Sequence, residues 1–186
     1  MRGPTPSQTV GPFFSIALGG GGGETVAPDD DPDRIVIAGI VFDGDSRHVE
    51  DALLELWQAD RTGRYRHPDD LMGSAFAGFG RAHTDYASGR YSFQTVKPGP
   101  VPSPGGEEQA PHISLIIQAR GMLNPLFTRV YFSDETAANR RDVVLGLVPV
   151  DRRPTLIAEL VETAVPPQYH FDVRLQGEGE TVFFDF

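Results

Sequence analysis

Residues 35–65 read IVIAGIVFDGDSRHVEDALLELWQADRTGRY, and this stretch carries the strongest signals of the fold. Residues 35–41 are rich in β-branched side chains, which favour a strand, and the dipeptide Asp43-Gly44 that follows favours a turn. Residues 53–58 give a second strand-like pattern. Two strand patterns separated by a turn signal indicate that the folded part of the chain begins as β-structure.

The rest of the chain continues in the same way. Further strand patterns cover residues 91–96, 112–119, 127–132, 169–176 and 181–186. Helical signals are few: residues 134–141 predict one short helix, and residues 154–161 predict another that has proline in its first turn. We find no internal repeat. The sequence therefore predicts an all-β fold, an antiparallel β-sandwich with long connecting loops and one or two short helices.

The N-terminal segment differs in composition. Residues 1–17 are rich in Pro, Ser, Thr and Gly, and five consecutive glycines, Gly19 to Gly23, precede the acidic run Asp29-Asp30-Asp31. Such a composition is typical of a flexible connector. A chain of 186 residues is long enough for one domain with a sizeable core. We therefore divide it into an N-terminal arm and glycine-rich connector, residues 1–34, and a β-sandwich domain, residues 35–186.

Composition narrows the choice of partners and chemistry. The chain has 16 basic and 26 acidic residues and a net charge of −10, which argues against a nucleic acid or an anionic membrane as partner. It has no cysteine, so disulfides, thiolate metal sites and cysteine nucleophiles are excluded. No apolar run reaches the ~18 residues of a membrane span. We expect a soluble cytoplasmic protein.

Two short motifs suggest half of a metal site. Tyr65 ends the turn Gly63-Arg64-Tyr65, and His112 begins His112-Ile113-Ser114. Ferric iron favours anionic oxygen donors together with imidazole, and a bound cation stabilises a phenolate at neutral pH. A non-haem ferric site of this kind needs two tyrosines and two histidines. The sequence supplies one of each.

Residues 37–65 resemble, position by position, the signature of the intradiol ring-cleavage dioxygenases, in which the terminal tyrosine is an iron ligand. The resemblance extends over nearly the whole chain, through LWQAD at 56–60, TVKPGP at 95–100, APHIS at 110–114 and QGEGETVFFDF at 176–186. The opening TPSQTVGP at 5–12 and the C-terminal run look specifically like the α subunits of this family. The resemblance implies a β-sandwich that takes part in oxidative cleavage of a catechol ring.

The ligand motifs depart from those of the family's catalytic β subunits. There, PGPYPW and HxH supply the second tyrosine and both histidines; here, residues 98–103 read PGPVPS and residues 112–114 read HIS. Val101 has no donor atom, and the neutral hydroxyl of Ser114 is a poor substitute for imidazole. We therefore expect Tyr65 and His112 to be relics that serve packing and hydrogen bonding, in a chain that binds no metal of its own.

The resemblance then implies a non-iron-binding α subunit that completes the active site of a homologous β subunit carrying Fe(III), within an (αβ)n oligomer. Arg120, in Ala-Arg-Gly at 119–121, matches the motif that reaches this shared site, and Thr9, Gly11, Pro12 and Phe13 match the segment at its rim. The complex would cleave protocatechuate, a small aromatic substrate, with O2 to 3-carboxy-cis,cis-muconate. The chain alone would be inactive and would contribute no catalytic residue.

Two other classes of protein remain open. One is a self-sufficient intradiol dioxygenase for catechol or hydroxyquinol with its own iron, against which Val101 and Ser114 argue. The other is a non-enzymatic β-sandwich binding module, such as a transthyretin-like or carbohydrate-binding domain. That class explains the fold and the missing ligands, but it does not explain the resemblance at both ends of the chain.

Overall fold

The computed structural model describes residues 3–11, 13–18, 22–66, 76–103 and 105–185, and strands make up most of its regular structure. The strands are β1 Arg34–Phe42, β2 Leu53–Gln58, β3 Phe79–His83, β4 Arg90–Val96, β5 Val101–Pro102, β6 Glu108–Gln109, β7 His112–Gln118, β8 Leu126–Phe132, β9 Ile157–Val161, β10 Gln168–His170 and β11 Val173–Arg174. The helices are short: α1 Phe13–Leu18, α2 Thr136–Asn139, α3 Val143–Leu147 and the 3-10 helix η1 Arg153–Leu156. The all-β prediction is confirmed.

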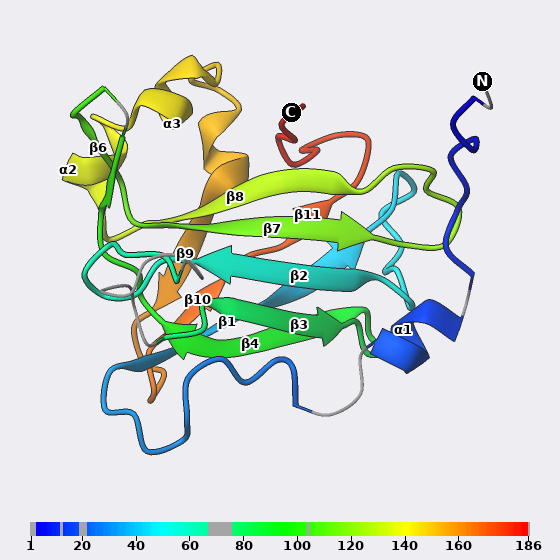
Figure 1. Ribbon diagram of the computed structural model, residues 1–186, viewed down its shortest axis with the longest axis horizontal. Coiled ribbons are helices and arrows are strands. Elements are labelled where there is room, and N and C mark those ends of the chain that lie inside the picture. The colour runs from blue at the N-terminus through cyan, green and yellow to red at the C-terminus, as the bar shows by residue number, and fades with distance from the viewer. Residues whose placement is uncertain (1–2, 12, 19–21, 67–75, 104, 186) are drawn as a thin grey trace.

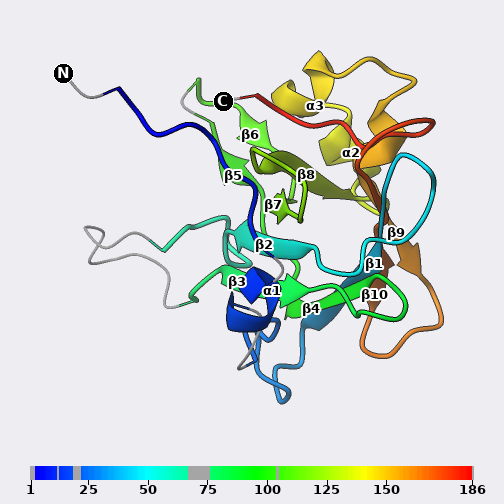
Figure 2. The same cartoon turned by 90° about the vertical axis from the view of Figure 1, so that its right-hand side faces the viewer.

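The strands form two halves that face each other across the core (Figures 1 and 2). In one half, β1 pairs antiparallel with β4 and parallel with β10 and β11. In the other half, β2 lies between β3 and β7, and β8 lies beside β7, all antiparallel. Strand β9 joins the halves, because it pairs antiparallel with β10 and parallel with β8. The predicted sandwich is confirmed, and its three parallel pairings were not foreseen.

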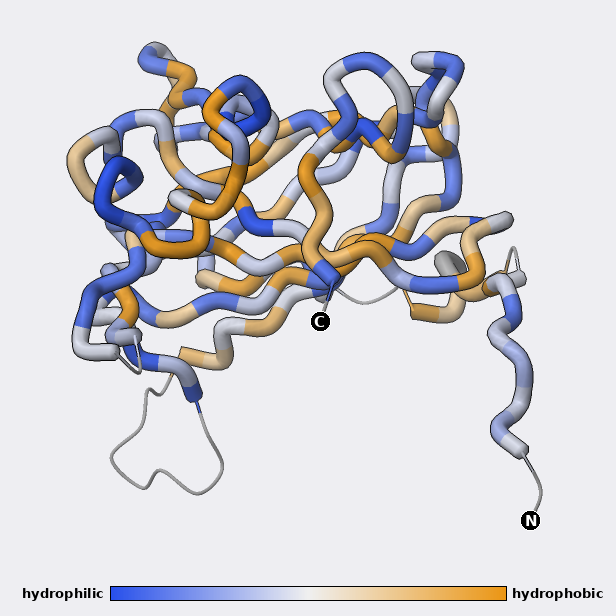
Figure 3. The backbone as a smooth tube through the Cα atoms, turned by 90° about the horizontal axis from the view of Figure 1, so that it is seen from above, coloured by the Kyte–Doolittle hydropathy of each residue, from blue (hydrophilic) through white to orange (hydrophobic). Residues whose placement is uncertain are grey.

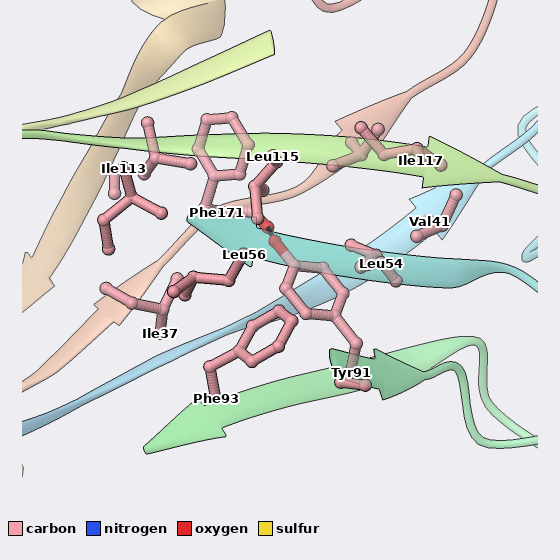
Figure 4. Close-up of a cluster of buried hydrophobic side chains, with 14 of the residues drawn as sticks. Ile37, Val41, Leu54, Leu56, Tyr91, Phe93, Ile113, Leu115, Ile117 and Phe171 are labelled. Atoms are coloured by element: carbon pink, nitrogen blue, oxygen red, sulfur yellow. Dashed lines mark hydrogen bonds between the residues drawn. The ribbon is translucent and has the colours of Figure 1, made fainter. Parts of the chain in front are cut away.

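Apolar side chains from the inner faces of both halves fill the core (Figure 4). Along β1 the burial alternates residue by residue, so one face of the strand supplies the core. Ile37 and Phe93 from one half and Leu56 and Leu115 from the other are each at most 1% exposed. Burying one such side chain contributes about 1.5–3 kcal/mol, so this shared core is what holds the two halves together.

Two predicted elements near the C-terminus need correction. Residues 154–161 were expected to form a helix, but the helical turn η1 ends at Leu156 and residues 157–161 form β9. The proline signal marks η1, and pairing with β8 and β10 then determines the structure of the rest. Residues 181–186 were expected to form a strand, but within 181–185 there is one bridge, from Phe184 to Phe127, and residue 186 lies outside the described residues.

The strand predicted over residues 169–176 is divided into β10 and β11. Between them, the Phe171 backbone lies so close to Gly39 of β1 that a Cβ at position 39 would lie 1.8 Å from the Phe171 oxygen. The carboxylate of Asp172 then accepts a hydrogen bond from the Ile40 backbone N–H at 2.9 Å. A side-chain hydrogen bond thus replaces the backbone pairing between the strands at this point, and the strand is interrupted between β10 and β11. Strand β3 and helices α1 and α3 were not predicted.

The described part of the glycine-rich connector is anchored to the sheet. The backbone N–H groups of Val26 and Ala27 donate to the Gln94 oxygen at 2.8 and 3.1 Å, and the Arg81 N–H donates to the Gly23 oxygen at 2.8 Å. Residues 22–34 are therefore not a free spacer, whereas Gly19, Gly20 and Gly21 lie outside the described residues. The division of the chain at residue 34 stays a prediction. No helix in the described part is long and apolar enough to cross a membrane.

Candidate functional site

Strand β7 has predicted site residues at both of its ends. His112 is its first residue, and Arg120 lies two residues beyond its last, Gln118. At about 3.3 Å per residue, the two positions are roughly 26 Å apart. Figure 1 shows β6, α2 and α3 around the start of β7 and the N-terminal arm beside its other end. We name these regions the degenerate ligand site (Tyr65, Val101, His112 and Ser114) and the arm site (Thr9, Gly11, Phe13 and Arg120).

Within the degenerate ligand site, His112 is a buried and hydrogen-bonded side chain. It is 2% exposed, and its Nδ1 lies 2.8 Å from the Ala110 carbonyl oxygen, so Nδ1 carries the proton and donates. Its ring packs 5.9 Å from the ring of Tyr131. Burial, reinforced by the positive charge of Arg129, lowers the pKa of His112 to about 4. The imidazole is therefore neutral at physiological pH.

Tyr65 packs as an aromatic side chain and remains a phenol. Its ring stacks on Trp57 with the centroids 5.7 Å apart and the planes at 18°. Burial raises the pKa of Tyr65, and the nearby Arg129 opposes that effect in part. Because the ordinary pKa of tyrosine is near ~10, the hydroxyl stays protonated at neutral pH.

Backbone contacts bring the four ligand positions into one neighbourhood. Gly63 has a φ of +80°, and a Cβ there would lie 1.9 Å from the Pro100 oxygen, so a glycine lets the turn before Tyr65 pack against the segment before Val101. Ser114 stands opposite Trp57 on one side and Arg129 on the other. The sequence prediction that these positions belong together is consistent with this arrangement.

The donor set at these positions does not suit ferric iron. It comprises one phenol, one imidazole, one hydroxyl and a valine that is 8% exposed, where the ion needs several strong anionic or imidazole donors. Within the described ranges, no group of three or more His, Cys, Asp or Glu residues could hold a metal ion. Arg129 of β8 stands opposite Ser114 in the strand register.

A second set of buried groups supports His112, and the sequence analysis did not find it. Asp142 is 2% exposed; its Oδ2 accepts from the Ala110 N–H at 2.8 Å, and its Oδ1 accepts from the Tyr131 hydroxyl at 3.0 Å. Oδ1 also caps α3 by accepting from the Leu145 N–H at 2.7 Å. Two signals in the sequence could have pointed to this set. Asp142 stands directly before an apolar run, and Arg129 is a charged residue inside a predicted strand.

The arm site joins segments that lie far apart in the sequence. The Gly121 backbone N–H donates to the Thr9 hydroxyl at 2.7 Å, a contact across 112 positions. Arg120 precedes Gly121; its Nε lies 3.1 Å from an Asp51 carboxylate oxygen, and its side chain is 58% exposed. The structure thus brings Thr9 beside the turn that holds Arg120, and the two were predicted to act together.

The remaining predicted residues of the arm are exposed. The Gly11 carbonyl accepts from the Phe14 N–H at 3.1 Å at the start of α1, and the Phe13 side chain is 75% exposed. Pro12 lies outside the described residues. Figure 3 shows the N-terminal segment leaving the body of the molecule as a mainly polar tube. An exposed phenylalanine on such an arm can be buried only by another molecule or by a change of conformation.

The chain matches the sequence model of the dioxygenase family over residues 11–177. It is 44% identical to the protocatechuate 3,4-dioxygenase alpha chain of Pseudomonas putida, over 98% of this chain and 96% of that one. It is 33% identical to the beta chain of Burkholderia cepacia, over 80% of this chain and 67% of that one.

Among solved structures, catechol 1,2-dioxygenase from Pseudomonas arvilla C-1 superposes with a TM-score of 0.63 at 24% identity, covering 82% of this chain and 55% of that one. At this identity the match concerns the fold. It agrees with the sandwich that positions β7 and its two ends. With matches in sequence over almost its full length and in fold, the chain belongs to the intradiol ring-cleavage dioxygenase family.

Proposed function

We propose that this chain is the α subunit of a protocatechuate 3,4-dioxygenase, which binds no iron itself and completes the active site of a homologous β subunit that carries Fe(III). The observation that carries the proposal is the loss of donors at Val101 and Ser114 in a chain that is 44% identical to an alpha chain over 98% of its length. A beta chain that is 33% identical supports a partner of the same fold.

In this complex the chemistry belongs to the partner subunit. Fe(III) there would activate the catechol ring toward O2, and cleavage between the two hydroxylated carbons would give 3-carboxy-cis,cis-muconate. This chain would bind and orient the substrate from the opposite wall. It supplies no ligand to the metal and no group that exchanges a proton with the substrate.

Arg120 is the residue suited to the substrate carboxylate. Asp51 contacts Nε, so the two terminal nitrogens of the guanidinium can still form a fork toward a carboxylate. In the isolated chain this side chain is 58% exposed, and a partner that covers it would exclude water and strengthen the interaction. The Asp51 contact would limit the directions in which the guanidinium can project.

The arm would form the rim of the shared pocket. Thr9 ties the arm to the Arg120 turn through its bond to the Gly121 N–H, so the arm and the guanidinium would reach the partner together. The exposed Phe13 would supply an apolar contact there. Trp57 and Phe79, which face each other on β2 and β3 and are 38% and 46% exposed, offer further aromatic area for a subunit interface.

Expression of the chain with and without its partner tests this function. We expect the pair to copurify as an αβ oligomer with one iron per αβ pair, and we expect the isolated chain to be colourless and to lack stoichiometric iron. One tightly held iron per isolated chain, with a visible tyrosinate band, would support the self-sufficient dioxygenase instead. Two independent monomers on sizing at micromolar concentration would contradict the complex.

A further inference from the structure

Helix α3 is apolar on both of its sides. Its five residues read VVLGL, and Leu145 packs into the core together with Val148, the residue after the helix. On the other side, Val143, Leu147 and Val150 are 42%, 82% and 73% exposed. A helix that is apolar all round is normally buried on every side. We name these three exposed side chains the α3 patch.

The α3 patch is held in place at both ends of the helix. Before the helix, the buried Asp142 accepts a hydrogen bond from the Leu145 N–H. After it, the Arg153 guanidinium donates from Nε to the Val148 carbonyl at 2.9 Å and from Nη2 to the Gly146 carbonyl at 3.1 Å. The patch is therefore a preformed surface, and a partner that covers it does not have to order it first.

The surroundings of the α3 patch are basic in a chain that is acidic. Residues 140–153 contain four arginines and two aspartates, a net charge of +2, so the other residues of a chain of net charge −10 sum to −12. Asp142 is buried, whereas Arg140 and Arg141 are exposed, and neither arginine forms an ion pair with another described residue. An apolar centre with arginines around it is typical of a protein interface, and its charge favours an acidic partner.

The most acidic ten-residue stretch of the sequence is residues 24–33, which contain five acidic residues and no basic one. We name it the acidic segment. Arg61 pairs with Asp31 and Asp33, so Arg61 compensates only part of this charge. In Figures 1 and 2 the acidic segment and α3 lie at opposite edges of the molecule. They cannot meet within one chain, but they can meet between two copies.

The acidic segment also has the shape and rigidity that a docking partner needs. Its backbone is bonded to β4, through the Gln94 N–H to the Glu24 oxygen at 2.9 Å and the Val26 N–H to the Gln94 oxygen at 2.8 Å. It presents two exposed prolines, Pro28 and Pro32, between its carboxylates. Rigid apolar rings beside negative charges complement an apolar patch beside arginines.

We propose that the α3 patch binds the acidic segment of a second copy of this chain, and that this contact joins one αβ unit to the next in the (αβ)n oligomer. A contact between two α3 patches would instead place arginines against arginines. The inference rests on the proposed αβ complex, since it concerns how such units associate.

Exchanging the charges tests the contact. In the αβ complex, Arg140→Glu with Arg141→Glu should reduce the oligomer to single αβ units, and Asp30→Arg with Asp33→Arg should do the same. Combining all four substitutions should restore the oligomer, because each contact then has opposite charges again. Mixing the two double variants should also give assembly, since the glutamates of one then face the arginines of the other. Sedimentation gives the masses, and iron content and thermal melting confirm that each αβ unit is intact.

The apolar part of the contact is tested at Leu147. Leu147→Glu should weaken association between αβ units by about ten-fold or more. Leu147→Met, which keeps an apolar side chain, should assemble as the wild type does. Val165→Glu is the matched control, because Val165 is 96% exposed and lies outside the patch.

Three results would overturn the proposal: single αβ units in the wild type, no recovery in the fourfold variant, or an Leu147→Glu variant that separates this chain from the β subunit. The last result would assign the patch to the contact within the αβ unit. Failure of the proposed function is distinguishable, because this chain and the β subunit would then already be separate in the wild type.

Discussion

The two ends of β7 share one strand and differ in almost every physical respect. At the degenerate ligand site, His112 is 2% exposed, and its Nδ1 donates to the carbonyl of Ala110, whose own N–H donates to Asp142. At the arm site, the Arg120 side chain is 58% exposed and forms an ion pair with Asp51. The backbone N–H of the next residue, Gly121, donates to the Thr9 hydroxyl. The described contacts of the buried end lie within the chain, whereas the exposed end presents a charged side chain that another molecule could bind.

This contrast separates stability from function along one strand. Substitutions at the buried end should change the folding of the chain and leave ring cleavage alone. Substitutions at the exposed end should change the kinetics of the complex and leave folding alone. A change in kinetics from the buried end, or a change in stability from the exposed end, would contradict this contrast.

The largest effect is expected at the buried end, on stability in acid. The folded His112 has a pKa of about 4, against an ordinary value of 6.5, so between these pH values the unfolded chain binds the proton more readily. Stability is therefore fully present above pH 6.5 and falls as the pH drops toward 4, by about 3 kcal/mol for this group.

Thermal midpoints of the αβ complex between pH 7 and about pH 4.5 measure this loss. His112→Gln should show a shallower decline than the wild type, and His48→Gln, an exposed histidine, should follow the wild type. Equal declines for all three would show that the burial of His112 has no energetic consequence.

The next largest effect is expected at the exposed end, on catalysis. Arg120→Ala should lower kcat/KM for protocatechuate by about ten- to hundred-fold, equivalent to one charged hydrogen bond of ~1.5–3 kcal/mol, with iron content and colour unchanged. Arg120→Lys keeps the positive charge but loses the two parallel N–H donors of the guanidinium, so its kcat/KM should lie between those of the wild type and Arg120→Ala.

Catechol distinguishes what Arg120 binds, because it lacks the carboxylate. A smaller loss with catechol indicates pairing with the carboxylate, and an equal loss indicates that the arginine serves an oxyanion. Unchanged kinetics with both substrates would make Arg120 an ordinary surface arginine and the chain a purely structural subunit.

A smaller effect is expected from the bond that ties the arm to the Arg120 turn. Thr9→Val removes the acceptor for the Gly121 N–H at nearly constant shape, and the loss of one hydrogen bond is worth ~0.5–1.5 kcal/mol. We therefore expect kcat/KM for protocatechuate to be about two- to ten-fold lower, and Thr9→Ser should keep most of the activity. A fall in melting temperature with unchanged kinetics would place the bond with the stability of the fold.

The smallest change at this end concerns Asp51. Its ion pair with the exposed Arg120 is worth ~0–1 kcal/mol. Asp51→Asn should therefore change KM for protocatechuate by less than about five-fold. A change as large as that of Arg120→Ala would mean that Asp51 positions the guanidinium and does more than neutralise it.

The sequence was sufficient for the parts of the fold whose signals are local. Strand β2 was predicted with its observed bounds, because its own residues carry the pattern. Strand β9 was missed because Pro154 gives a helical signal and the pairing partners, β8 and β10, are decided by the tertiary fold. The missing donors at Val101 and Ser114 could be read directly, since an absent side chain needs no structure.

The contacts that define the two sites could not be predicted in the same way. The bond from Thr9 to Gly121 spans 112 positions, and the bond from Arg129 to Gln109 depends on the registers of two separate strand pairs. Only the resemblance to a family placed Arg120 and the arm together. No local signal marked Arg129 as the partner of a lost ligand, because cross-strand neighbours are set by register.

The most direct test of the account is Tyr65→Phe in the αβ complex, which removes the last phenol among the ligand positions and keeps the ring that stacks on Trp57. If the chemistry belongs to the partner subunit, iron per αβ pair, the tyrosinate band and kcat/KM for protocatechuate should all equal those of the wild type. Loss of iron or of the band, in a variant that assembles normally, would show that this chain holds the metal and would contradict the account.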